Sequence, residues 1–223
     1  METAERAALD EALERAFDRK RANFLEDYDL NAKPALIWQA WPATEVEVDI
    51  SSEKLREAMR GGGGPGSDDG WWHGFKMSWW PSLVFDGLAS TTERGGAGWA
   101  TEIHVDGHVS AGVWTFPESG RGTANPGLGV ADFYADAFRD FTYLARKVFE
   151  IAGAYEAVHL TTTMHQADRL ALLTNPGRVV VPAPKRKTLR WPIATVNAAE
   201  LPAAGSRMAA QFMRMYGRKA LMS

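Results

Sequence analysis

Residues 99–114, WATEIHVDGHVSAGVW, decide the fold class of this chain. Two extended arms flank Asp106-Gly107, the residue pair that a two-residue type I′ turn favours. The sequence therefore predicts a β-hairpin at this point.

The register of this hairpin predicts where its two histidines point. With a two-residue turn, Val105 pairs with His108 and His104 pairs with Val109. The two imidazoles then fall on opposite faces of the ribbon. We therefore expect no metal ion shared by His104 and His108.

Further strands and helices are predicted on both sides of the hairpin. β-Branched and aromatic runs bounded by proline, glycine or serine are typical of strands. Such runs occupy residues 34–42, 44–50, 82–90, 154–165, 178–182 and 187–196. Apolar residues spaced near 3.6 positions apart predict helices. These occupy residues 3–31, 51–61, 130–152 and 203–219.

This pattern predicts an α+β fold with a mostly antiparallel sheet of seven or eight strands, two long helices and a C-terminal helix. Two units are expected along the chain. Residues 1–31 form an N-terminal amphipathic helix, and residues 32–223 form a single α+β domain. Within that domain, residues 61–70 are expected to be a flexible glycine-rich loop.

The composition excludes several classes of protein. The chain has 223 residues, of which 45% are hydrophobic and 24% charged, so it can bury a substantial core. It contains no cysteine, which excludes disulfides, thiolate metal sites and cysteine nucleophiles. The first twenty residues lack the apolar core of a secretory signal, and no apolar run approaches the roughly 18 residues that span a bilayer. We expect a cytoplasmic protein with no membrane partner.

The glycine-rich loop contains a G-x-G-x-x-G match without the context of a nucleotide site. A predicted helix precedes it, and Pro65 interrupts it. Asp68-Asp69 also stand near the place where a Walker loop needs Lys-Ser or Lys-Thr. A connector is the better interpretation of these glycines.

Four tryptophans follow the glycines, namely Trp71, Trp72, Trp79 and Trp80. They form either buried core or an aromatic surface that stacks on a flat ligand. Adjacent residues of an extended chain point to opposite faces, so one ring of each pair is expected to face outward. We assign Trp72 and Trp80 as candidate ligand-binding residues.

A polar strand face carries the remaining histidine candidates. Alternation places four polar side chains together, namely His159, Thr161, Thr163 and His165. This face is either exposed to solvent or lines a cavity. The two histidines stand about 20 Å apart and cannot share a metal ion. His159 is a candidate ligand-binding residue, and in an alternative enzymatic reading His165 pairs with Asp168 as acid and base.

Positive charge is concentrated at the end of the chain. From residue 178 onward, nine basic residues stand against one acidic residue, a net charge of +8 that leaves −11 on residues 1–177. Four cations lie within PKRKTLR, and they are the candidate anion-binding residues Lys185, Arg186, Lys187 and Arg190. This segment either binds nucleic acid or a nucleotide, or it packs against the acidic N-terminal helix or is simply solvated.

The order of these elements resembles the C-terminal region of bacterial Schlafen-like proteins. The pieces that carry the resemblance are PALIWQAWP, SSEKLREAM, FDGLAS, EIHVDGHV and LRWPIATVNAAEL. In that family an Alba-type module precedes such a region and carries the DNA or ATP binding. This sequence has one charged helix in its place, so none of that module's residues can be assigned here. The resemblance implies an accessory or sensing domain in a bacterial defence or regulatory system.

Together these observations predict a non-catalytic recognition or sensing domain that binds an anionic ligand, such as a nucleotide or nucleic acid, or a protein partner. The alternative is a small hydrolase-type enzyme that uses His165 and Asp168. A third hypothesis is a homo-oligomer formed through the first or last helix. No metal site and no cofactor are expected.

Overall fold

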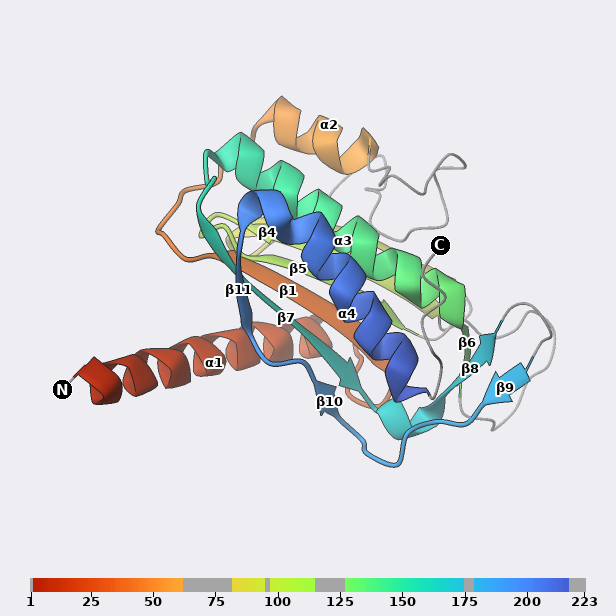
Figure 1. Ribbon diagram of the computed structural model, residues 1–223. Helices are drawn as coiled ribbons and strands as arrows, with labels where there is room; N and C mark the ends of the chain where they lie inside the picture. Colours follow the sequence, from red (N-terminus) through yellow and green to blue (C-terminus); the bar gives the residue numbers. More distant parts are fainter. Residues whose placement is uncertain (1, 62–81, 95–96, 115–126, 175–178, 217–223) are drawn as a thin grey trace.

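The computed structural model describes residues 2–61, 82–94, 97–114, 127–174 and 179–216. An eight-stranded sheet forms its centre. Helices α3 and α4 cover one face of that sheet, and α1 crosses the other face (Figure 1). The predicted α+β class with a mostly antiparallel sheet is therefore confirmed.

All pairings in the large sheet are antiparallel, in the order β10-β7-β1-β5-β4-β3-β2, and β11 also pairs with β7. Strand β1 lies between β5 and β7 and is the most enclosed of them. The strands are β1 (Ala35–Pro42), β2 (Ser82–Val84), β3 (Gly87–Arg94), β4 (Ala97–His104), β5 (Val109–Trp114), β7 (Ala157–His165), β10 (Leu189–Arg190) and β11 (Ala194–Asn197).

A second sheet of three short strands lies beside the first. It consists of β6 (Gly127–Val130), β8 (Leu170–Thr174) and β9 (Val179–Val181). Strands β6 and β8 are parallel, whereas β8 and β9 are antiparallel. The sequence did not predict β6 or β8.

Four α-helices and two short 3-10 helices are described. They are α1 (Glu2–Asp27), α2 (Glu53–Gly61), α3 (Ala131–Ala152), η1 (Ala167–Arg169), η2 (Ala198–Glu200) and α4 (Leu201–Met215). Gly153 follows α3 with φ 74°, a left-handed conformation that glycine adopts at helix C-termini without steric cost. The side chain of Asn197 accepts a hydrogen bond from Ala199 N and so caps the N-terminus of η2.

The main core lies between the sheet and the α3–α4 layer, and aromatic rings dominate it. Trp38 of β1 is fully buried. Its ring meets Phe138 edge-on at 5.2 Å and stacks on Phe141 at 6.3 Å between centroids. Phe138 also contacts Phe212 of α4 at 5.6 Å and Trp191 at 5.8 Å. One strand, two helices and the β10–β11 segment thus share a buried aromatic cluster.

Helices α3 and α4 approach each other closely at Gly205, which is buried in α4. A Cβ atom on this residue would lie 2.8 Å from the carbonyl oxygen of Phe138 and closer still to the hydroxyl of Thr142. Real Cβ atoms do not tolerate such contacts, so only glycine fits here without moving a helix.

The opposite face of the sheet forms a smaller core with the C-terminal half of α1. It contains Phe24, Leu25, Leu30, Ala35, Ile37, Ala100 and Trp114. Gly112 of β5 lies directly beneath Phe24, and a Cβ there would stand 2.6 Å from the ring. This part of α1 is therefore fixed to the sheet by close packing.

The hairpin at residues 99–114 is present, but the predicted register is wrong. Ile103 pairs with Val109, so the loop is longer than two residues. Gly107 N donates to His104 O, and Gly107 has φ 77°. A turn followed by a left-handed glycine is typical of a three-residue hairpin loop. As a result, His104 and His108 point to the same face, with ring centroids 5.5 Å apart.

Two other predicted strands are corrected. Residues 44–50 form no strand. Both edges of the preceding strand, β1, are already occupied by β5 and β7. Within residues 44–50, Val48 N donates instead to Val105 O of the hairpin loop. The segment 82–90 is a hairpin of β2 and β3 rather than one strand, because the chain turns at Asp86 with φ 57°.

Candidate functional site

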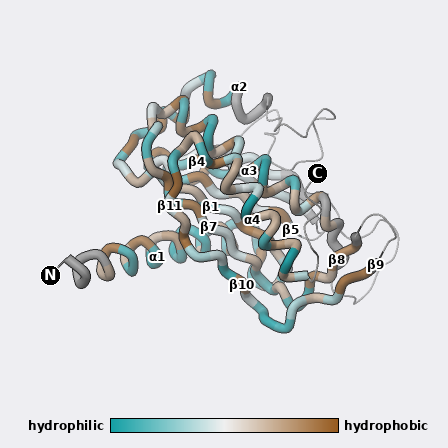
Figure 2. The backbone as a smooth tube through the Cα atoms, in the orientation of Figure 1, coloured by the Kyte–Doolittle hydropathy of each residue, from teal (hydrophilic) through white to brown (hydrophobic). Residues whose placement is uncertain are grey.

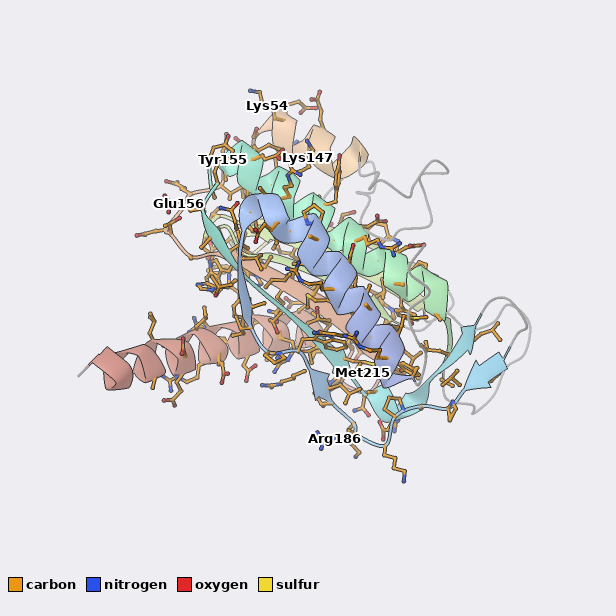
Figure 3. All side chains as sticks on the ribbon, viewed as in Figure 1. Lys54, Lys147, Tyr155, Glu156, Arg186 and Met215 are labelled. Atoms are coloured by element: carbon orange, nitrogen blue, oxygen red, sulfur yellow. The ribbon has the colours of Figure 1, made fainter. Side chains whose placement is uncertain are left out.

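Lys185, Arg186 and Lys187 form what we call the basic segment, and all three are exposed. The chain between β9 and β10 is hydrophilic along this stretch (Figure 2). Arg186 lies at the periphery of the molecule, on the loop that precedes β10 (Figure 3). Within the described parts of the chain, no ion pair engages any of the three side chains. Three neighbouring cations are thus presented together to solvent.

The backbone at the C-terminal end of the basic segment and just after it is anchored to the fold. Ala167 N donates to Lys187 O at 2.7 Å, which attaches the segment to η1. Trp191 N donates to Thr162 O at 2.9 Å, and the Trp191 side chain is 6% exposed. The burial of Trp191 in the aromatic cluster fixes the chain that follows the basic segment. The three cations therefore lie beside η1 and the start of β10.

Arg190, the fourth predicted cation, has a partner on α1. Its guanidinium lies 3.0 Å from Asp18 Oδ2, and Arg21 lies 2.8 Å from Asp18 Oδ1. Burial lowers the pKa of Arg21, and the nearby charge of Arg190 adds to the lowering. For Arg190, therefore, the structure matches the alternative in which the basic tail packs against the acidic helix.

Arg169 is a further cation at this edge that sequence reasoning missed. It is exposed and donates to Ala32 O at 3.0 Å. It lies two residues from Ala167, whose N–H binds the carbonyl of Lys187. Only the folded chain brings η1 beside the basic segment, so no local sequence signal marks Arg169.

The predicted histidine candidates contact their own chain. His159 Nδ1 lies 3.0 Å from Thr195 Oγ1, and burial lowers the pKa of His159 while Asp10 opposes that shift. His165 Nε2 donates to Asn31 O at 2.9 Å and so helps to hold the turn after α1. No hydrogen bond joins His165 to Asp168 in the described structure. The acid–base alternative stays a prediction.

The polar face of β7 is covered by α1 rather than exposed at its centre. Thr161 is 6% and Thr163 2% exposed. Arg21 donates to Thr163 Oγ1 at 3.3 Å, and Thr161 donates to Trp191 O at 2.8 Å. A solvent-facing position is therefore wrong for these two threonines.

A buried polar cluster continues across the sheet beneath α1, formed by Gln39, Glu102, His104, His108 and Ser110. Gln39 Nε2 lies 3.2 Å from Phe17 O and 3.3 Å from His108 Nε2. Ser110 Oγ lies 3.4 Å from His108 Nδ1. The cluster therefore connects His108, which immediately precedes β5, to the backbone of α1 through one amide side chain.

Burial governs the ionisation of this polar cluster. It places the pKa of His108 well below its usual value of 6.5, and the charges of His104 and Lys20 act in the same direction. At the other end of the cluster, Tyr28 donates to Glu102 at 2.9 Å. Burial raises the pKa of Tyr28, and the neighbouring Glu102 charge adds to that effect. His108 is thus neutral at neutral pH.

Acidification is expected to destabilise the fold through His108. The unfolded chain binds a proton at this histidine below about pH 6.5, whereas the folded chain does so only at lower pH. The free energy of unfolding should keep its full value above pH 6.5 and fall by up to about 1.4 kcal/mol per pH unit below it. Urea titrations between pH 7.5 and 5 measure this. The slope of the free energy of unfolding against pH should be smaller in His108→Gln than in the wild type. An equal slope in both proteins would contradict the assignment of this pH dependence to His108.

No group of three or more His, Asp or Glu side chains in the described ranges is arranged to hold a metal ion. None of the helices in those ranges combines the length and the apolar character needed to cross a bilayer. The molecule is thus an α+β protein whose described surface carries one unpaired basic segment. Comparison with protein-family models, curated proteins and solved structures found no match to this chain.

Some of the predicted ligand contacts lie outside the described residues. These are Trp72 and Trp80. Residues 62–70 of the predicted flexible loop also lie outside the described residues, whereas Gly61 is the last residue of α2. They stay predictions.

Proposed function

We propose that this protein is a non-catalytic recognition domain that binds an anionic ligand, with nucleic acid as the ligand class, through Lys185, Arg186 and Lys187. The observation that carries the proposal is the exposure of all three cations without a carboxylate partner in the described chain. Arg190, by contrast, already pairs with Asp18.

The chemistry of the basic segment suits a chain of phosphates. Lysine contributes a compact point charge, and arginine adds a planar fork that can contact two phosphate oxygens. Neutralising phosphates releases counterions from the nucleic acid, so binding gains most at low salt. Because Ala167 holds the carbonyl of Lys187 and Trp191 is anchored to Thr162, the C-terminal end of the segment is already fixed before a ligand binds.

Replacing the three cations by serine tests this proposal. The variant Lys185→Ser/Arg186→Ser/Lys187→Ser should bind a short DNA duplex at least about tenfold more weakly at 50 mM salt. The slope of log K against log salt should shrink by about 2–3, because three phosphate contacts are lost. Fluorescence anisotropy over a salt series measures both quantities.

A matched control separates the segment from net charge. Arg19, Arg207 and Arg214 are also exposed, so replacing all three by serine removes the same charge elsewhere on the surface. This control should keep most of the affinity. Equal losses in both triple variants, or no binding by the wild type at 50 mM salt, would contradict a nucleic-acid site at the basic segment.

A further inference from the structure

Gln39 connects α1 to the sheet by a hydrogen bond that depends on the protonation of His108. The Nε2 amide group of Gln39 lies within hydrogen-bond distance of two atoms, Phe17 O at 3.2 Å and His108 Nε2 at 3.3 Å. A carbonyl oxygen can only accept, so the amide nitrogen must face Phe17. The same nitrogen therefore also faces the imidazole.

This geometry assigns the tautomer of His108. Because Gln39 offers an N–H to His108 Nε2, that ring nitrogen must be unprotonated and accept. The proton of the neutral ring then lies on Nδ1 and points to Ser110 Oγ, 3.4 Å away. The oxygen of the Gln39 amide, Oε1, is buried and has no partner among the described residues.

A second proton on His108 does not fit this arrangement. It would attach to Nε2 and place two N–H donors against each other across the 3.3 Å contact with Gln39. Turning the Gln39 amide would bring its unpartnered Oε1 to the new N–H. The same turn would set that oxygen against Phe17 O and remove the hydrogen bond to α1.

The charges around His108 do not offer it a free counterion. From α1, Lys20 faces the ring. From the hairpin, Asp106 Oδ1 accepts from His108 N, and Asp106 Oδ2 is paired with Lys20 at 2.9 Å. From β4, His104 faces the ring and is paired with Glu102 at 3.2 Å.

The other neighbours of His108 carry no charge. Trp41 and Gln39 face it from β1, Phe17 faces it from α1, and Ser110 lies beside it on β5. A cationic His108 would thus be buried beside Lys20 and His104, with both nearby carboxylates already engaged.

We propose that His108 is a proton-operated latch for α1: protonation at Nε2 in mildly acidic solution turns the Gln39 amide, breaks its bond to Phe17 and releases from the sheet the part of α1 that precedes Phe24. The proton comes from solvent, and no covalent bond other than the new N–H forms. This inference does not rest on the basic segment or its ligand.

The rest of the α1 interface permits this partial release. Between Ala7 and Ala16, most side chains of α1 are exposed, and Leu9 is 69% exposed. The middle part is held by Phe17, which is buried against Trp41, and by the Lys20–Asp106 and Arg190–Asp18 ion pairs and the Arg21–Thr163 hydrogen bond, all of which must break on release. Phe24 and the residues after it stay packed in the smaller core, so α1 can separate up to that anchor while the sheet remains folded.

Paired spin labels can follow this movement, because the chain has no native cysteine. Ala12→Cys and Ala199→Cys place one label on the exposed part of α1 and one on η2, both at exposed positions. Pulsed electron paramagnetic resonance then gives the label-to-label distances at pH 7.5 and pH 5. The ratio of displaced to docked α1 should rise by up to roughly thirtyfold between these two pH values.

Two histidine variants make the test specific. In the His108→Gln background the distance distribution should not respond to pH. In the matched His165→Gln background it should respond as in the parent, because His165 bonds Asn31, which follows the anchor at Phe24. An unchanged distribution in the parent between the two pH values, or an equal response in His108→Gln, would overturn the proposal.

A measurement on the unsubstituted chain covers the case in which His108→Gln does not fold. Long-range ¹H–¹⁵N correlation spectra distinguish the two neutral tautomers of an imidazole. At pH 7.5, His108 should carry its proton on Nδ1. A proton on Nε2 would contradict the Gln39 geometry and with it the latch.

Discussion

Replacing Trp38 by alanine is expected to lower the free energy of unfolding by about 3–5 kcal/mol. Trp38 is fully buried in the central strand, where its ring contacts Phe138 and Phe141. The substitution would remove one of the two tryptophan side chains buried in this layer and leave a cavity bounded by two helices that cannot close around it. The lost aromatic contacts add about 0.5–1.5 kcal/mol each to the cost of lost burial.

Chemical denaturation with tryptophan fluorescence and circular dichroism measures this loss. For a chain of this length, each kcal/mol corresponds to about 2–4 °C in Tm. Trp38→Phe keeps a ring in the layer and should lose less, which provides a measurable variant if Trp38→Ala does not fold. Tyr155→Ala serves as the control, because Tyr155 is 64% exposed and its loss should cost under about 0.5 kcal/mol. Similar losses at positions 38 and 155 would contradict the aromatic cluster.

Gly205→Val is expected to cost about 3 kcal/mol or more, by separating α4 from α3. The added Cβ would meet the backbone carbonyl of Phe138 at 2.8 Å, and a helix backbone cannot yield without displacing its neighbours. Valine also introduces two methyl groups where the two helices approach each other closely. Thermal unfolding followed by far-ultraviolet circular dichroism would register the change.

A substitution at an exposed position of α4 distinguishes the loss of stability caused by this clash from the loss caused by low helix propensity. Ala203 lies two residues earlier in α4 and is exposed, so Ala203→Val tests the effect of a β-branched residue alone. Its cost should be below about 1 kcal/mol. In a Gly205→Ala background, Thr142→Ala should restore part of the lost stability, because it removes the hydroxyl that the new methyl group would meet. A Gly205→Val protein as stable as Ala203→Val would refute the close approach.

Local sequence patterns predicted the elements whose signals extend over many residues. The spacing of apolar positions predicted α1 and α3, and the pattern around Asp106-Gly107 predicted the β4–β5 hairpin. The register of that hairpin was wrong because Asp106-Gly107 also suits a three-residue loop in which only Gly107 is left-handed. Because the loop is one residue longer than predicted, His104 and His108 lie on the same face of the hairpin rather than on opposite faces.

Local sequence patterns could not predict the three-stranded sheet of β6, β8 and β9, for a different reason. Strands β6 and β8 have four and five residues, which is too short for a periodic pattern. They are also parallel and pair across α3 and β7, so that each finds its partner only in the folded chain. Pairing of this kind leaves no turn signal in the sequence.

The candidate site was predictable only in part. The basic segment is contiguous, so its charge is visible in the sequence and its exposure follows from the flanking prolines and the polar composition. The polar cluster under α1 comes from separate strands and the hairpin loop, and Gln39 lies in a strand that otherwise appears apolar. Besides the polar alternation of Thr161 and Thr163, that glutamine in ALIWQAW was a signal that could have indicated a polar layer on the α1 side of the sheet.

The position of β1 between β5 and β7 has a consequence for how the chain is made. β1 leaves the ribosome early, and β5 can join it next, yet Ala35 pairs with His165 on its other edge. Until translation has passed residue 165, the apolar strand ALIWQAW presents an unpaired edge. Pairing over so long a loop is slow, and open apolar edges promote association between nascent chains. Protection from aggregation therefore arrives only with β7, and demand for chaperones should be greatest just before this strand is made.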